Sequence, residues 1–379
     1  MKTVQLKLNK QNEFEYTSEK QELKEPLVLV FGNRVLLQDP TIYDKIKSIF
    51  NDGHIVFGST SGDIISNTVS ENSLTITAIE FEKSSFLVKK ANIIKEDNVI
   101  DSYETGKQLI DQFPKENLKY VLVISEGSFI NGSKLTIGMN SANDSNILIT
   151  GGLCGDDDKF ETTLASYNEN PKQGEIVAVG FYGDTIEVTF ATNGGWMPFG
   201  PERIVTKSKD NVLYELDDKP ALDLYKTYLG SKSKELPGAA LLFPLNVTSE
   251  NESKSVVRTI LNIDEEKNSM ILAGDIKEGS KAQLMMTGMD NLVDAAENGA
   301  VQALRLRENK PDLAIIVSCI GRKLVLDQRV EEEIEEVIEI IGDKATVCGF
   351  YSYGEIAPFD LEMSCQLHNQ SIAITLISE

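Results

Sequence analysis

Three glycine-rich loops in the chain each carry a carboxylate, and each follows an apolar run. They read GSTSGD at residues 58–63, GGLCGD at 151–156 and GFYSYGE at 349–355. Glycines after a strand allow tight turns that present N–H groups to an anion, and an acid beside them attracts a cation. An anion site next to a cation site suits a small zwitterion. The alternative is that the glycines only allow turns and the acids cap helices or loops.

One arginine and several hydroxyl or aromatic side chains accompany these loops. Arg322 follows another apolar run, and its planar guanidinium suits a bidentate contact with a ligand carboxylate. Its alternative role is to hold the loops together by pairing with Glu355 or Asp156, and Trp196 is also explained as a packed junction residue. The candidate ligand-binding residues are Ser61, Gly62, Asp63, Gly152, Gly155, Asp156, Trp196, Ser318, Arg322, Tyr351, Tyr353, Gly354 and Glu355.

Residues suited to catalysis or metal binding are scarce. The two histidines, His54 and His368, are predicted at the surface, which leaves Ser318 and Cys319 without an evident general base. No Cys/His cluster or nucleotide-binding glycine motif occurs, and the acids at 156–158 lack EF-hand spacing. We therefore expect no catalytic residue, no metal and no cofactor. A hydrolase or transferase that uses Cys319 or Ser318 remains an alternative.

The charge and hydropathy of the chain restrict its partners. Lys and Arg total 37 against 59 Asp and Glu, so the net charge is −22, and phosphate backbones or anionic lipids would repel the protein. No apolar segment is long enough for a signal peptide or a membrane span. These features predict a cytoplasmic protein with free thiols, without nucleic-acid or membrane partners.

The three loops belong to three similar units. In each unit an apolar run ends at a polar loop, a helix follows, a second run enters the acidic loop, and a third run closes the unit. The runs begin at Leu27, Ile55 and Leu74, at Val121, Ile147 and Ile176, and at Leu313, Ala345 and Ile372. Because these runs are nearly continuous in apolar residues, we expect central strands that are covered on both faces.

Apolar spacing and end signals predict four further helices and a domain boundary. The helices are predicted near residues 39–53, 218–230, 290–307 and 329–342, with the glutamates from 331 to 336 facing water. Glycines and prolines cluster at 194–201, which places a boundary near residue 205. The predicted fold is α/β, with mixed sheets flanked by helices in two domains of pseudo-repeated strand–helix–strand–loop–strand units.

Five motifs in a fixed order resemble the FIST family (F-box and intracellular signal transduction). They are FGSTSGDI (57–64), GGLCGDD (151–157), GGWMPFGPERIVTKS (194–208), SCIGRKLVL (318–326) and GFYSYGEIAP (349–358). The first loop has Ser-Thr-Ser-Gly-Asp where the family more often has Cys-Ser-Thr-Ala-Gly-Glu, which questions any role for a thiol there. The resemblance implies an extension at 1–26, a FIST N-like domain at 27–204 and a FIST C-like domain at 205–379.

The resemblance also implies a function. Similar proteins are sensory modules of intracellular signal transduction that are proposed to bind small ligands such as amino acids. They are often fused to kinase, cyclase or chemotaxis output domains. Here the resemblance fills the chain, so the expected partners are a small molecule, bound between the two halves, and a separate downstream signalling protein such as a kinase or cyclase. The alternatives are a haem-binding gas sensor of the FIST type and a ligand-free protein-interaction scaffold.

Overall fold

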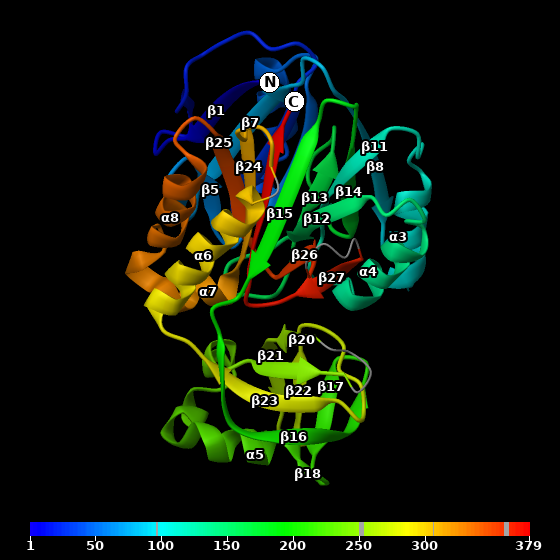
Figure 1. Ribbon diagram of the computed structural model, residues 1–379, viewed down its shortest axis with the longest axis vertical. Helices are drawn as coiled ribbons and strands as arrows, with labels where there is room; N and C mark the ends of the chain where they lie inside the picture. Colours follow the sequence, from blue (N-terminus) through cyan, green and yellow to red (C-terminus); the bar gives the residue numbers. More distant parts are fainter. Residues whose placement is uncertain (96–97, 250–253, 306, 360–363) are drawn as a thin grey trace.

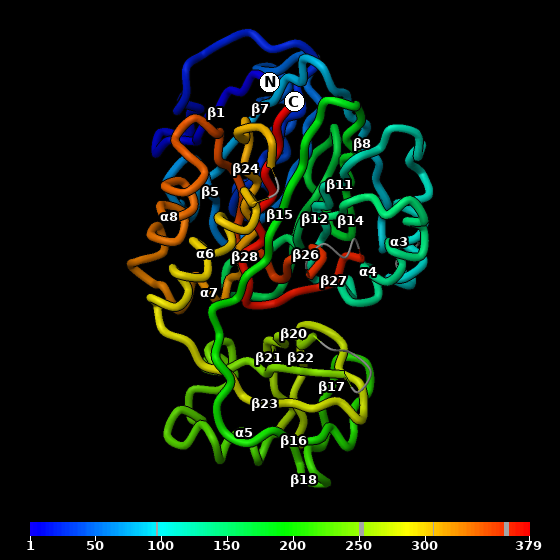
Figure 2. Tube along the Cα trace, in the orientation of Figure 1, coloured from blue at the N-terminus to red at the C-terminus, as the bar shows by residue number. Residues whose placement is uncertain are grey.

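The computed structural model describes residues 1–95, 98–249, 254–305, 307–359 and 364–379. Within these residues, three six-stranded sheets and their flanking helices form what we call the body (Figure 1). A further sheet forms what we call the inserted domain, residues 197–286, which leaves the body after β15 (Glu187–Asn193) and returns at α6 (Met289–Leu304). Figure 2 shows that the chain crosses between the two parts along two neighbouring segments.

The first sheet has the order β13-β4-β3-β7-β1-β2. Its strands are β1 (Lys2–Leu8), β2 (Phe14–Tyr16), β3 (Leu27–Gly32), β4 (His54–Ser59), β7 (Leu74–Glu80) and β13 (Ala165–Tyr167). β3 and β4 are parallel, and β7 is antiparallel to β3. The helices α1 (Arg34–Leu37) and α2 (Ile42–Ile49) share a hydrophobic cluster with this sheet.

The second sheet has the order β27-β26-β12-β11-β14-β8. Its strands are β8 (Ser85–Asn92), β11 (Leu118–Ser125), β12 (Leu148–Leu153), β14 (Glu175–Tyr182), β26 (Gly354–Pro358) and β27 (Cys365–His368). The helices α3 (Ser102–Asp111) and α4 (Gly132–Ser141) pack on it, and β9 (Ile94–Lys95) pairs with β10 (Asn98–Val99) beside it.

The third sheet has the order β15-β28-β24-β25-β5-β6. Besides β15, its strands are β5 (Asp63–Ile65), β6 (Thr68–Ser70), β24 (Leu313–Cys319), β25 (Thr346–Ser352) and β28 (Ile372–Ser378). α6 and α8 (Glu332–Ile341) pack on this sheet, α7 (Ile320–Leu326) follows β24, and the short helix η3 (Asp327–Arg329) precedes α8.

The inserted domain has its own sheet and its own core. Its strands are β16 (Met197–Lys209), β17 (Val212–Leu216), β18 (Lys219–Pro220), β19 (Leu245–Thr248), β20 (Ser255–Arg258), β21 (Ile260–Asp264), β22 (Ser269–Leu272) and β23 (Lys281–Met286). Its helices are α5 (Ala221–Leu229), η1 (Gly230–Glu235) and η2 (Gly238–Leu242). Residue 205, near the boundary that the sequence indicates, lies inside β16, which joins the sheet pairings of this domain.

The three repeated units exchange strands in a cycle. β5 of the first unit pairs with β25 of the third, β26 of the third pairs with β12 of the second, and β13 of the second pairs with β4 of the first. In every case the guest strand lies antiparallel to the second strand of the host unit. Each sheet is therefore mixed, as predicted, and each is completed by a strand from another unit.

The core of the body lies where the three sheets face one another. Leu29 of the first unit, Leu122 of the second and Ile315 of the third belong to one buried cluster. Separate clusters fill the space between the opposite face of each sheet and its helices. The central strands are thus covered on both faces, which confirms the expectation from their apolar runs.

The helices predicted from apolar spacing are present as α2, α5, α6 and α8. One detail of the last prediction is wrong, because Glu333 is fully buried and does not face water. Its position on α8 turns it toward β24 and β25, where Ser318 and Tyr351 donate hydrogen bonds to its carboxylate. The apolar pattern alone could not separate Glu333 from its exposed neighbours, since the partner groups come from other elements.

Candidate functional site

The three acidic loops meet at one place, which we call the hub: residues 59–63, 153–157 and 351–355. Backbone hydrogen bonds join them in a ring. Gly155 donates to the Ser59 carbonyl at 2.9 Å, Tyr353 to the Leu153 carbonyl at 3.1 Å, and Ser61 to the Tyr351 carbonyl at 2.9 Å. The hub therefore follows from the strand exchange, because each guest strand leads its loop to the next unit.

The ring fixes which residues are equivalent in the three units. Ser59, Leu153 and Tyr351 accept the three bonds, so counting forward by four places Asp63, Asp157 and Glu355 at one equivalent position. Asp156 corresponds instead to the glycines Gly62 and Gly354. The sequence reading aligned Asp156 with the other two acids because its motif was matched by glycine spacing alone.

Asp63 and Glu355 are buried carboxyl groups, and among the described residues their hydrogen-bond donors are all neutral. Thr60 and Ser73 donate to Asp63, both at 2.5 Å. Ser352 and Ser371 donate to Glu355 through their hydroxyls, both at 2.7 Å. Burial raises the pKa of each carboxyl group to about 7, although these hydrogen bonds act in the opposite direction.

Lowering the pH from 8 to 6.5 is expected to stabilise the fold through these two groups by about 1.5 kcal/mol in total. An acid with a raised pKa in the folded state contributes stability that is full below its unfolded pKa and is lost as the pH rises through the folded pKa, here about 7. His368, whose folded pKa burial lowers to about 4, opposes this by about 0.4 kcal/mol at pH 6.5, because half of its unfolded form is protonated there. Urea denaturation across this range tests the prediction.

The matched control is the double variant Asp63→Asn, Glu355→Gln, which keeps the shapes and removes both titrations. The difference in free energy of unfolding between wild type and this variant should therefore change with pH by the predicted amount. If the variant gained as much stability as wild type on acidification, other groups would be responsible and the assignment would be wrong.

Arg322 is fully buried, and its hydrogen bonds run to the protein interior. Its Nε and Nη2 donate to one oxygen of Glu333 at 3.0 and 2.7 Å, and its Nη1 and Nη2 donate to the carbonyls of Gly194 and Leu292 at 2.5 and 2.8 Å. The arginine thus pairs with Glu333, and not with Glu355 or Asp156 as the structural alternative proposed. It joins α7 to α8, α6 and the start of the inserted domain.

Asp156 and Tyr353 form the second polar contact of the hub. The Tyr353 hydroxyl donates to the Asp156 carboxylate and accepts from the backbone N–H of Phe160 at 3.0 Å, while the two rings of Phe160 and Tyr353 stack at 4.3 Å. The other carboxylate oxygen accepts from the N–H groups of Glu161 and Thr162. These bonds fold residues 156–162 into a loop over the hub.

The remaining candidates in the loops are explained by close packing. A Cβ on Gly155 would lie 2.3 Å from the Ser61 hydroxyl, and one on Gly152 would lie 2.6 Å from Val317. Gly62 has a φ of +140°, where side chains are rare, and lies beside Lys323. The ammonium group of Lys323 donates to the Ser61 carbonyl at 2.8 Å. At these glycines, the absence of a side chain allows loops and strands of different units to approach closely.

Trp196 and His368 lie in packed surroundings. The Trp196 indole donates to the Gln370 carbonyl at 2.9 Å and packs with Leu292 where the chain enters the inserted domain, as its junction role predicts. His368 is buried, so its predicted surface position is wrong. Its Nε2 lies 2.9 Å from the Ala357 carbonyl, and its ring meets Phe359 edge to face.

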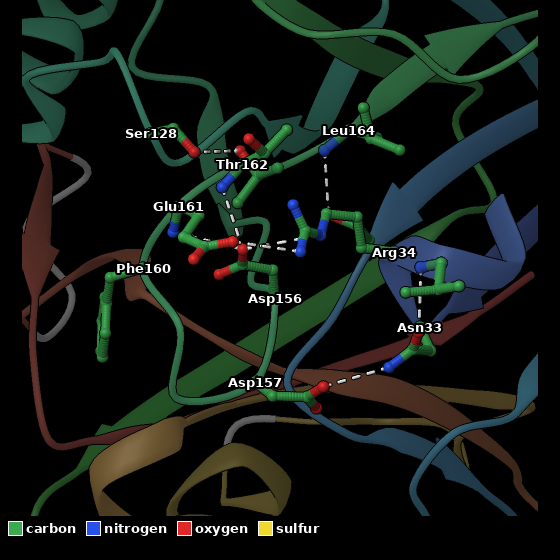
Figure 3. Close-up of polar contacts among 12 residues, drawn as sticks. Asn33, Arg34, Ser128, Asp156, Asp157, Phe160, Glu161, Thr162 and Leu164 are labelled. Atoms are coloured by element: carbon green, nitrogen blue, oxygen red, sulfur yellow. Dashed lines mark hydrogen bonds and ion pairs between the residues drawn. The ribbon is translucent and has the colours of Figure 1, made fainter. Parts of the chain in front are cut away.

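One edge of the hub, which we call the rim, is more open and carries side chains that the sequence reading missed. It consists of Asn33, Arg34, Asp157 and Glu161 (Figure 3). The Arg34 side chain is 16% exposed, with Nη2 3.3 Å from Glu161 and Nε 3.7 Å from an Asp156 oxygen. That Nε is buried and lacks a hydrogen-bond acceptor in the described structure.

Asn33 positions this arginine. Its side chain accepts from the Val35 N–H at 2.9 Å, which caps α1, and donates to Asp157 at 3.0 Å. The signal for the rim was present in the sequence, because Asn33 and Arg34 directly follow Gly32, where the first apolar run ends. Among the equivalent loops, only that of the third unit contributed predicted site residues, Ser318 and Arg322.

Further observations concern thiols, metals and membranes. Cys154, Cys319, Cys348 and Cys365 are buried and unbridged, and burial raises the pKa of Cys319 well above its usual value. In the described part of the chain, no group of three or more His, Cys, Asp or Glu residues is placed to hold a metal ion. None of the helices described combines the length and apolar character that crossing a membrane needs.

Comparisons with known proteins match nearly the whole chain. The family model described as the FIST N domain matches residues 26–219, and the one described as the FIST C domain matches residues 221–358. The two matches meet beside β18, within the inserted domain. An uncharacterized protein of Methanocaldococcus jannaschii is 26% identical, in an alignment that covers 84% of this chain and 68% of the relative.

Proposed function

The chain belongs to the FIST family, whose domains are associated with sensing in signal transduction, and from this premise we propose that it is a sensory module that binds a small zwitterion such as an amino acid. The observation that carries the proposal is the guanidinium of Arg34. It lies at the partly open rim, and its Nε lacks a hydrogen-bond acceptor among the described residues.

The rim suits a ligand better than the interior of the hub does. Arg322 already donates hydrogen bonds to Glu333, and the carboxyl groups of Asp63 and Glu355 already accept from internal hydroxyl and N–H donors. A buried N–H without an acceptor costs free energy, which a ligand carboxylate would recover by displacing the exposed Glu161 side chain from the Arg34 guanidinium. At the rim, Arg34 therefore takes over the carboxylate-binding role that the sequence analysis gave to Arg322.

The charges around Arg34 complete the requirements of a zwitterion. The Glu161 side chain is 65% exposed and lies 3.3 Å from Nη2 of Arg34, and Asp157 is only partly buried. An α-carboxylate on the Arg34 fork would leave the α-ammonium within the field of these carboxylates. A dianion would be repelled by them, and a simple cation would be repelled by Arg34.

Replacing Arg34 by glutamine is expected to weaken amino-acid binding about ten- to a hundred-fold, the usual cost of losing a charge-assisted hydrogen bond. Isothermal titration calorimetry with a panel of the common amino acids measures the affinity. Arg203→Gln is the matched control, because Arg203 lies on the inserted domain and pairs with Asp217. An amino acid that bound wild type and Arg34→Gln equally well would refute this site.

We further propose that the module is not an enzyme, that it acts in the cytoplasm and that its output passes to a signalling protein such as a kinase or cyclase. The raised pKa of Cys319 supports a role without a nucleophile, and the Glu333 carboxylate that accepts from Ser318 is fully buried and already paired with Arg322. The net charge of −22 and the four unbridged cysteines support a reducing, non-membrane setting.

A further inference from the structure

An open groove runs between the hairpin of β1 and β2 and the helices α1 and α2, with a volume of about 690 Å³. Its apolar lining comes from both walls: Leu8 and Phe14 on the hairpin, and Val35, Leu36, Ile42 and Ile49 on the helices. Val35 is 58% exposed at the lip, whereas Ile42 lies buried at the base. The lining therefore offers an apolar strip that is most exposed at Val35.

The charge of the groove is acidic. Of its three charged lining residues, Lys45 is bound to Asp39 at 2.7 Å, which leaves the Glu13 carboxylate without an ion pair in the described structure. Asp44, exposed on α2 and adjacent in the chain to Lys45, adds a further carboxylate on this helix. The whole chain carries a charge of −22, so a partner that brings positive charge is attracted before contact.

We propose that this groove binds a basic amphipathic helix of a partner protein. The proposal rests on the proposed sensory function and identifies the surface through which the sensor would contact its signalling partner. Apolar side chains of such a helix, one turn apart, would fill the strip, and its Lys and Arg residues would face Glu13 and Asp44. An anionic membrane does not fit, because the same charges would repel it. The open lip also favours a helix over an enclosed small molecule.

The groove and the rim share α1, which is one turn long. Arg34 begins this helix and faces the rim, and the next two residues, Val35 and Leu36, line the groove. Asn33 caps the helix and is bound to Asp157 of the hub. A ligand that shifted the backbone at Arg34 would also shift Val35 and Leu36, so α1 is the element that would link ligand binding to partner binding.

The test uses fluorescently labelled helical peptides of about 18 residues, or five turns, with Lys and Arg on one face and varied apolar residues on the other. Binding to the full chain without ligand is measured by fluorescence anisotropy. At least one peptide is expected to bind wild type, and Val35→Lys is expected to weaken it at least ten-fold. Ile137→Lys is the matched control, since Ile137 is 56% exposed on α4 and the change in net charge is identical.

Several outcomes overturn the proposal. These are equal weakening by both lysine variants, equal binding of peptides with Glu in place of Lys and Arg, or no binding of any basic peptide. A dimer of wild type that Val35→Lys dissociates would assign the groove to a second copy of this chain. The peptide measurement uses no amino acid, so a negative result would not bear on the Arg34 titrations. A negative result in those titrations would likewise leave the peptide measurement valid.

Discussion

Replacing Arg322 by methionine is expected to lower the free energy of unfolding by about 3 to 5 kcal/mol, the usual cost of breaking a buried ion pair by removing one partner. Glu333 would stay buried with the bonds from Ser318 and Tyr351 but without a counter-charge. The carbonyls of Gly194 and Leu292 would also lose their donor. Urea denaturation of the ligand-free protein at neutral pH measures the effect.

The second variant in this experiment is Arg322→Met with Glu333→Leu. It also removes the buried charge that the first variant leaves without a partner, so it should recover a large part of the lost stability. A role in ligand binding predicts the opposite pattern, in which Arg322→Met leaves the ligand-free protein as stable as wild type. That result would support a role of Arg322 in ligand recognition.

Cutting the chain at the boundary indicated by the sequence is expected to leave the segment 1–204 without a cooperative unfolding transition. The segment 1–204 retains β5 and β15, but their partners β25 and β28 lie beyond the cut. It also contains β12 without its guest strand β26. Apolar surface that is buried in the full chain would become exposed, which favours aggregation.

Size-exclusion chromatography, urea denaturation and binding of a hydrophobic dye would compare the fragments with the full chain. The inserted domain, residues 197–286, is the positive control, because the pairings of its sheet lie within it and it has its own core. It is expected to unfold cooperatively. If 1–204 behaved as a compact monomer with a sharp transition, the strand exchange would not be essential to the fold.

Much of the fold could be predicted because local patterns determine it. The runs that begin at Leu27, Val121 and Leu313 form strands at the centres of the three sheets, since each is apolar enough to be buried on both faces. The strand exchange could not be predicted, because β5 and β26 are short and their hosts are chosen by long-range packing. The separate sheet of 197–286 was missed for the same reason.

The candidate site was predictable only in part. Glycine spacing located the hub, but it aligned Asp156 with Asp63 and Glu355, while the backbone ring places Asp157 there. The partner of Arg322 could not be found from the motif, because Glu333 lies on another helix within a run of glutamates. Arg34 was overlooked although it follows the first apolar run, since no partner for it stands nearby in the sequence.

The position of β28 bears on how the protein is made. This strand, Ile372–Ser378, lies between β15 and β24, so β15 has no partner in the third sheet until residue 378 has been synthesised. β5, synthesised some three hundred residues earlier, must wait for β25 before it can pair. Such distant pairings raise the contact order and slow folding. During synthesis the first two units would expose apolar strands, so we expect yield in cells to depend on chaperones.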